Sequence, residues 1–220
     1  MTTVQRMVVA AMGGAVAGAI AIRVLAPGTR AQLDLSPAMK VSVGLWVLFS
    51  VYWSIASKNS AATQTSETSW SRQLHVVLVN GALLLLVLPI PGLTQRFLPE
   101  RRWLVVAGLV IQAAFIAFAV WSRRHLGRNW SGEVRIATDH ELVRSGPYRY
   151  IRHPIYTAVL GMYCGTALVS GQIHALVGLV VVTAAYWRKI GLEERALEAR
   201  FGADHAAYRR GTWNLIPYVY

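Results

Sequence analysis

Long apolar runs constrain the fold of this chain more than any other feature of its sequence. A hydrocarbon core of about 30 Å needs roughly 20 helical residues. Four runs reach or approach that length with few charges, and two slightly shorter runs follow them. Because hydrophobic residues make up 55% of the 220 residues and charged residues only 15%, too little polar surface remains to cover these runs in a soluble protein. The runs are residues 7–26, 41–56, 74–90, 103–121, 154–170 and 173–187.

We therefore expect an all-α fold, a polytopic transmembrane helical bundle of about six spans. Residues 1–220 would form a single integral membrane domain, with N-terminal spans over 1–121 and a loop, a helical hairpin and a C-terminal helix over 122–220. Only Gly171 and Gln172 separate the last two runs, which predicts that they form a tight hairpin. We interpret the first run as a span, because it is longer than the apolar region of a typical signal peptide.

Positive charge is concentrated in two segments. Of the 22 Lys and Arg residues, seven lie within 123–152 and six within 188–210. The positive-inside rule places both segments in the cytoplasm, which agrees with a hairpin that returns the chain to its starting side. The loop 91–102 disagrees with this topology, because it carries three arginines on the opposite side. Anionic lipid headgroups explain the net charge of +12 better than nucleic acid does, because the arginines flank spans.

The sequence GPYRYIRHPIY, residues 146–156, sets Arg152 and His153 at the mouth of an apolar run. Two adjacent carboxylates, Glu193 and Glu194, follow the last run. Ionisable groups at the edge of a membrane are costly unless they are paired, so these groups indicate either a functional site or a structural ion-pair cluster. The candidate cationic partners of the two carboxylates are Arg152, His153, Arg188 and Lys189.

Three further segments have simpler interpretations. Apolar residues recur at helical spacing over 192–208, which predicts an amphipathic helix at the cytoplasmic membrane surface. The segment 122–152 mixes glycines with aromatic residues, so it is either a ligand-binding loop or an interfacial anchor. The Ser- and Thr-rich tract 57–71 is typical of a solvated loop. The single cysteine, Cys164, excludes an internal disulfide, and we expect no metal site.

An ordered set of motifs runs through the C-terminal half of the chain. The motifs are HELV at 140–143, SGPY at 145–148, RHPIY at 152–156, the hairpin, the pair Glu193-Glu194, FG at 201–202, and Tyr208. Over about residues 126–217 this set resembles the isoprenylcysteine carboxyl methyltransferase family of integral membrane enzymes, and the resemblance implies a methyl transfer from S-adenosyl-L-methionine. The acceptor would be a lipophilic or lipid-linked molecule that enters from the bilayer, with an isoprenylcysteine-type carboxylate as one candidate. The active site would face the cytoplasm.

The resemblance also implies roles for individual residues. Lys189 and Glu194 would be catalytic, and Arg188 and Lys189 would bind the acceptor. Related enzymes that methylate a carboxylate carry an arginine where this chain has Lys189, and lysine lacks the planar two-pronged grip of a guanidinium. A prenylcysteine carboxylate is therefore less well supported than the cofactor. The cofactor residues would be His140, Glu141, Leu142, Val143, Tyr148, His153, Pro154, Ile155, Tyr156, Glu193 and Glu194.

Two alternative functions stay open from the sequence alone. Membrane sterol and related isoprenoid reductases have a similar hairpin and glutamate-bearing tail and bind a nicotinamide nucleotide, but they are usually longer. A membrane scaffold or transporter subunit predicts a polar path through the spans, where Asn80 and Gln112 are nearly the only polar residues. The sequence does not indicate an oligomeric state.

Overall fold

The computed structural model describes residues 35–57, 64–65, 68–127, 130, 135–136 and 142–218. The regular secondary structure of this part of the chain is helical, apart from an antiparallel pair of two-residue strands in which Gln64 lies opposite Ile136. The first predicted span, 7–26, lies outside the described residues. The helices are α2 (Pro37–Ala56), α3 (Ser69–Val87), α4 (Arg102–Leu126), the 3₁₀ helix η3 (Gly146–Arg149), α5 (Pro154–Ser170), α6 (Ile173–Phe201) and α7 (Ala203–Arg210), and the strands are β1 (Gln64–Thr65) and β2 (Arg135–Ile136).

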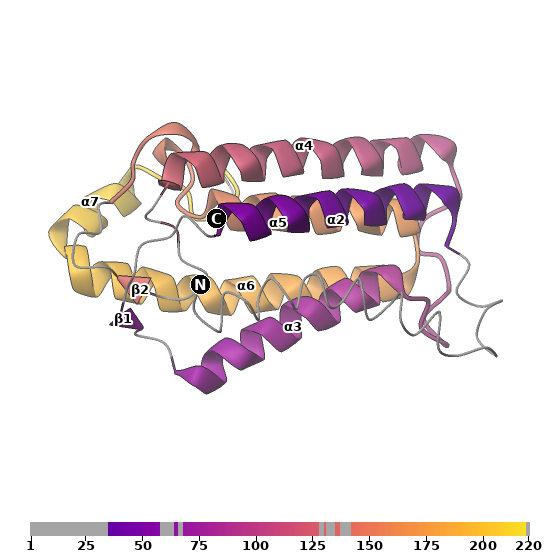
Figure 1. Ribbon diagram of the computed structural model, residues 1–220, viewed down its shortest axis with the longest axis horizontal. Coiled ribbons are helices and arrows are strands. Elements are labelled where there is room, and N and C mark those ends of the chain that lie inside the picture. The colour runs from indigo at the N-terminus through magenta and orange to yellow at the C-terminus, as the bar shows by residue number, and fades with distance from the viewer. Residues whose placement is uncertain are drawn as a thin grey trace.

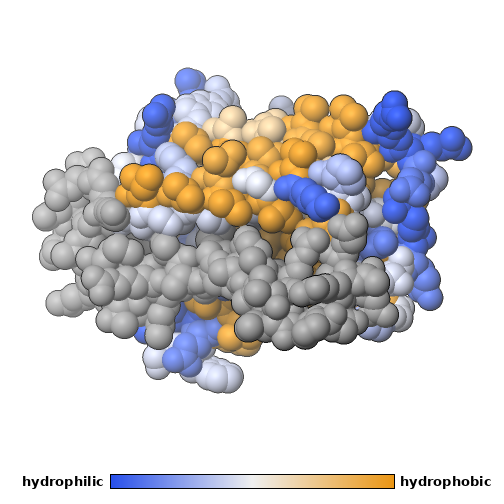
Figure 2. Space-filling view, turned by 45° about the vertical axis from the view of Figure 1, so that its right-hand side comes forward, coloured by the Kyte–Doolittle hydropathy of each residue, from blue (hydrophilic) through white to orange (hydrophobic). Residues whose placement is uncertain are grey.

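Four of the five membrane spans predicted in the described part of the chain are confirmed as helices of sufficient length and hydropathy. Helices α2, α3, α4 and α6 are long and apolar enough to cross a membrane, and α5 is a shorter apolar helix that occupies the predicted range. Figure 2 shows hydrophobic residues gathered across the middle of one face, with hydrophilic residues toward its ends. This distribution is the one that a lipid-facing surface requires.

The predicted amphipathic helix over 192–208 is wrong as a separate element. Helix α6 runs for 29 residues without a break, so the last span continues directly into that segment. Gly191 does not interrupt it, because the residues that follow it are mostly strong helix formers. The helix ends only at Gly202, which has a φ of 47°. Helix α7 then follows as a short independent element.

Two loop predictions also need correction at their edges. Helix α4 continues to Leu126, so the first five residues of the predicted loop 122–152 are helical. Three basic residues in its last turn favour this extension, because cations stabilise the negative end of a helix dipole. Helix α3 begins at Ser69, inside the predicted loop 57–71, where the side chain of Thr68 accepts a hydrogen bond from the amide of Ser71.

The bundle has two ends of different character. Helices α4, α2 and α5 lie lengthwise together, while α3 crosses α6 obliquely, and α7 and the two strands lie at one end (Figure 1). At the other end the predicted hairpin turn is confirmed, with Gly171 in the left-handed conformation. The loop after α3 covers this turn, because the amide of Ile173 donates to the carbonyl of Gln95 at 2.9 Å.

Helices α4 and α5 approach each other closely at two glycines. A Cβ built on Gly165 would lie 2.6 Å from the carbonyl oxygen of Gly108 and 2.8 Å from the amide nitrogen of Gln112. Small residues allow this kind of backbone contact, which drives helix association where lipid replaces water. The α4–α5 pair therefore forms the tight centre of the bundle.

A buried polar cluster joins α2 to this pair. The hydroxyl of Ser42 donates to Oε1 of Gln112 at 2.7 Å and lies 3.1 Å from the hydroxyl of Thr166. The indole of Trp46 donates to the same Thr166 hydroxyl at 3.0 Å. These bonds satisfy polar groups that would otherwise be unpaired among apolar side chains.

Replacing Gly165 by alanine should separate α4 from α5. The new methyl group would clash with backbone atoms that cannot rotate away, so we expect the free energy of unfolding to fall by about 1–3 kcal/mol. The measurement is the apparent Tm of the detergent-solubilised protein. Gly44→Ala is the control, because no heavy atom lies within 4 Å of its added Cβ. An equal fall in Tm for both variants would contradict this account of the packing.

Candidate active site

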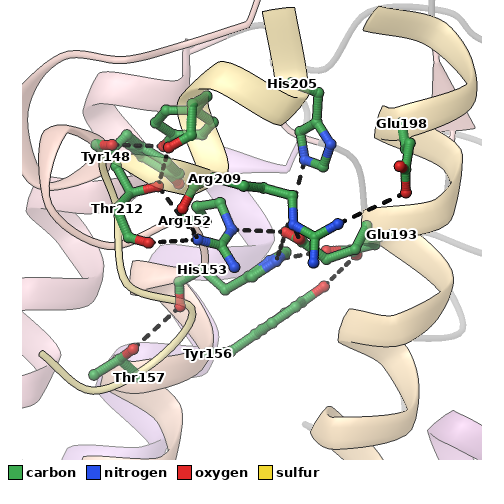
Figure 3. A network of polar contacts seen from close by, with 12 residues as sticks. Tyr148, Arg152, His153, Tyr156, Thr157, Glu193, Glu198, His205, Arg209 and Thr212 are labelled. Atoms are coloured by element: carbon green, nitrogen blue, oxygen red, sulfur yellow. Dashed lines mark hydrogen bonds and ion pairs between the residues drawn. The ribbon is translucent and has the colours of Figure 1, made fainter. Parts of the chain in front are cut away.

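The candidate active site lies where α5 begins and α6 ends (Figure 3). Pro154 is the first residue of α5. Proline suits this position because the backbone N–H of a first helical residue has no acceptor within the helix, so its absence costs no hydrogen bond. The backbone just before Pro154 is bound by the C-terminal tail, residues 212–218. The amide of Arg152 donates to the carbonyl of Trp213 at 2.8 Å, and the amide of His153 donates to that of Asn214 at 3.1 Å. These bonds hold Arg152 and His153 against the end of α6.

Glu193 and Glu194 are adjacent on α6 and largely withdrawn from solvent, with side-chain exposures of 20% and 11%. Successive helical residues point in directions about 100° apart, so the two carboxylates have different neighbours. Removing two carboxylates from water costs several kcal/mol each unless cations and hydrogen-bond donors surround them. The neighbouring elements supply both.

His153 bridges the two carboxylates. Its Nε2 lies 2.8 Å from Oε1 of Glu194, and its Nδ1 lies 3.4 Å from Oε2 of Glu193. Burial disfavours charge on the ring, but hydrogen bonds and charge from both glutamates outweigh burial and raise the pKa of His153. Because each ring nitrogen faces an ionisable acceptor, the arrangement favours the imidazolium, which donates in both directions.

Two arginines complete the charge balance at Glu194. Arg152 donates from Nε to Oε1 of Glu194 at 3.1 Å, and Arg209 of α7 places its Nε 3.3 Å from Oε2. Arg209 also pairs with Glu198 at 3.7 Å. His205 of α7 lies fully buried with Nε2 3.8 Å from Oε1 of Glu194, and burial lowers its pKa. Helix α7 thus closes the site on the side opposite α5.

Aromatic side chains surround the other carboxylate. The hydroxyl of Tyr156 donates a short hydrogen bond to Glu193. The Tyr156 ring stacks on His153, with centroids 5.7 Å apart and an interplanar angle of 5°. On its other side it meets the buried ring of Tyr186 at 4.7 Å. The carboxylate of Glu193 therefore lies beside a stack of three rings, those of His153, Tyr156 and Tyr186.

Tyr148 joins η3 to this site through α7. The hydroxyl of Tyr208 donates to the backbone carbonyl of Tyr148 at 2.5 Å. Burial raises the pKa of Tyr208 to about 12 and raises the pKa of Tyr148 above its usual range, so both hydroxyls are neutral near pH 7. The SGPY and Tyr208 motifs, 60 residues apart, meet here.

The remaining predicted site residues divide into three groups. Pro154 and Ile155 are buried at the start of α5, and Ile155 belongs to the apolar core. Lys189 is only 2% exposed on α6, whereas its neighbour Arg188 turns to α3 and donates to the hydroxyl of Ser71 at 2.6 Å. Leu142 and Val143 are half-buried before η3, and His140 and Glu141 lie outside the described residues.

Sequence reasoning missed several residues of the site. Tyr186 is seven residues before Glu193, two helical turns, and this spacing could have placed both on one face of α6. Arg209 and His205 left no comparable signal, because their approach depends on the chain turning at Gly202. The missed residues are Tyr186, His205, Arg209 and Thr212, whose backbone carbonyl accepts from Arg152 Nη1 at 2.6 Å.

The chain is similar in sequence to known methyltransferases. Residues 103–204 match the family model described as phospholipid methyltransferase. The chain is 30% identical over 132 residues to protein-S-isoprenylcysteine O-methyltransferase A of Arabidopsis thaliana and 32% identical over 82 residues to protein-S-isoprenylcysteine O-methyltransferase of Schizosaccharomyces pombe. These alignments cover 59% and 37% of this chain, and 64% and 35% of the relatives. The chain is therefore similar to methyltransferases over part of its length.

The fold is shared with a solved membrane methyltransferase. The solved structure of a eukaryotic intramembrane Ras methyltransferase, isoprenylcysteine carboxyl methyltransferase, matches 91% of this chain and 77% of that protein with a TM-score of 0.54 and 20% identity. At this identity the match concerns the fold alone. The chain spans about 64% of the length of the Arabidopsis relative, so the similarity does not transfer that protein's activity or acceptor.

The charge on His153 should make the stability of this protein pH-dependent. Because its pKa is raised in the folded state, its stabilising contribution is complete below about pH 6.5, the ordinary value, and is lost as pH rises through the folded value. The apparent Tm in detergent should fall as the pH rises above about 6.5, and fall less steeply in His153→Gln. His125→Gln, exposed at the end of α4, is the control and should keep the wild-type slope. An unchanged slope in His153→Gln would refute the bridging role.

Proposed function

We propose that the chain is an S-adenosyl-L-methionine-dependent methyltransferase that works at the membrane on a lipophilic acceptor. The observation that carries the proposal is the buried pair Glu193 and Glu194, held by His153 and Arg152 at the mouth of the α5–α6 hairpin. The match of residues 103–204 to the phospholipid methyltransferase model supports the reaction class. Among the described residues, the SGPY and RHPIY motifs, the glutamate pair and Tyr208 lie at this same end of the bundle.

The residues at the site fit the cofactor's chemistry. Oε2 of Glu194 is buried and accepts no hydrogen bond within the described part of the chain, although Arg209 lies 3.3 Å away as an ion pair. A buried carboxylate oxygen of this kind suits an amino group or ribose hydroxyl. The rings of Tyr156 and Tyr186 form an aromatic wall beside Glu193, of the kind that suits an adenine. We expect contributions from the rest of the proposed cofactor set as well, namely His140, Glu141, Leu142, Val143, Tyr148, Pro154 and Ile155.

S-adenosyl-L-methionine supplies an already activated methyl group, so the protein's task is placement. An in-line displacement gains most from holding two reactants close and aligned and from excluding water. Glu193 and Glu194 would orient the donor by its polar groups. His153, with its proton held between two carboxylates, is better suited to positioning them than to serving as a general base.

Lys189 is our candidate for the acceptor side. It lies one turn before Glu193 on α6 and is almost fully buried. Arg188 is less well suited, because its guanidinium bonds Ser71 on α3. An ammonium attracts an anionic or polar acceptor group but lacks the two-pronged geometry of arginine, so the acceptor class extends beyond carboxylates. The acceptor would enter sideways from the bilayer, and the donor would enter from the cytoplasm, where the arginine-rich end of the bundle belongs.

The purified protein in detergent should bind S-adenosylhomocysteine at micromolar level. Glu194→Gln and His153→Ala should weaken this binding about 10- to 100-fold, because a hydrogen bond to a charged group contributes about 1.5–3 kcal/mol. Isothermal titration calorimetry measures both affinities. Elution volume and helicity would confirm that the variants fold.

The matched control is Glu198→Gln, one turn beyond Glu194 on the same helix and exposed, with side-chain exposure of 58%. It should change the affinity less than twofold. Binding of NADPH without any response to S-adenosylhomocysteine would overturn the proposal in favour of a reductase. Binding of neither ligand would favour a non-enzymatic role.

The role of Lys189 is tested with a panel of lipophilic thiols, amines and carboxylates and a labelled methyl donor. Lys189→Met should lower kcat/KM at least tenfold for the acceptor that the wild type prefers, while Arg188→Met should change it little. Scintillation counting of the extracted lipid product measures turnover. Fast methylation of a prenylcysteine that Lys189→Met leaves intact would show that this residue does not bind the acceptor.

A further inference from the structure

The C-terminal tail, residues 212–218, is bound along the start of α5. Beyond the backbone bonds to Arg152 and His153, the amide of Trp213 donates to the carbonyl of Tyr150 at 2.9 Å. The hydroxyl of Thr157, in the first turn of α5, donates to the carbonyl of Leu215 at 2.6 Å. The path of the tail past Thr212 and Thr157 is visible in Figure 3. The tail therefore has a defined inner and outer side.

The outer side of the tail is apolar and aromatic. Asn214 and Leu215 are buried, whereas Trp213, Ile216 and Tyr218 are 41%, 50% and 87% exposed. The rings of Trp213 and Tyr218 lie 5.2 Å apart. Tyr150, whose carbonyl binds the tail, is 60% exposed beside them. We call Tyr150, Trp213, Ile216 and Tyr218 the aromatic patch.

Composition and charge indicate what covers this patch. Trp and Tyr have an apolar body and a polar tip, and they concentrate where a bilayer meets water. Arg149 lies over the ring of Tyr150, with its guanidinium carbon 5.8 Å from the ring centroid, and Arg210 is exposed just before the tail. Cations beside interfacial aromatics are complementary to anionic headgroups.

The patch is also continuous with the lipid-facing surface of the bundle. Trp121, in the last turns of α4, is 46% exposed and packs against His125, whose ring lies against Gly146 of η3. Helix η3 leads directly to Tyr150. The aromatic patch thus lies near the C-terminal end of α4, where the apolar surface of that helix ends.

We propose that the aromatic patch is a membrane-docking surface that lies in the headgroup region of an anionic leaflet. It holds the tail on the bilayer at the same end of the bundle as the carboxylate pair. One side chain belongs to both, because Arg152 donates from Nη1 to the carbonyl of Thr212 and from Nε to Glu194. The docking surface is independent of methyl transfer and goes beyond the proposed function.

The test measures the depth of a spin label in vesicles of phosphatidylcholine with about 30% phosphatidylglycerol. Cys164 is the only cysteine, so Cys164→Ala gives a background in which Tyr218→Cys is labelled. We expect relaxation of the label by oxygen to exceed relaxation by a water-soluble nickel chelate several-fold. The control is Glu198→Cys in the same background, where the order should be reversed.

A label at 218 that is as accessible to the nickel chelate as the label at 198 would overturn the proposal. Dipolar broadening between labels at 218 would also overturn it, because the patch would then lie between two copies. In vesicles of phosphatidylcholine alone the label at 218 should lie measurably shallower, and an unchanged depth would exclude the anionic headgroup. The depth does not depend on cofactor binding, so failure of the methyltransferase proposal would leave this result intact.

Discussion

The burial of two adjacent carboxylates at the end of an apolar bundle governs the rest of this structure. Glu193 and Glu194 can stay charged at low exposure only if cations face them from several directions. Arg152 and His153 directly precede α5, while α7 provides Arg209. These cations come from two separate parts of the chain. The meeting of α5, α6, α7 and the tail is therefore an electrostatic requirement as well as a packing arrangement.

The apolar part of the bundle meets a different constraint. Lipid offers little hydrophobic driving force between helices, so close contact and internal hydrogen bonds must hold them together. The glycine contact between α4 and α5 and the Ser42 cluster provide these in the half of the bundle away from the carboxylates. The rigid α4–α5 pair then presents the start of α5 at a defined position against α6.

The sequence predicts this architecture well where the signal is local. The turn at Gly171 and the range of α5 follow from apolar runs and a glycine between them, and the meeting of His153 with Glu193 and Glu194 follows from motif order. The extent of α6 could not be predicted in this way, because Gly191 and Gly202 are both followed by residues that favour a helix. Only Gly202 takes a positive φ and ends the helix. The position of Arg209 depends on that choice, so the sequence could not reveal it.

The segment after α6 completes the site because a hairpin alone cannot supply enough donors. Two carboxylates present four oxygens, and α5 with its preceding residues offers the imidazole of His153, the guanidinium of Arg152 and the hydroxyl of Tyr156. While Nε of Arg152 donates to Glu194, its Nη1 donates to the carbonyls of Arg209 and Thr212, which fix the guanidinium in place. Arg209 itself then faces the last oxygen of Glu194. Order in the tail and charge in the site are therefore mutually dependent.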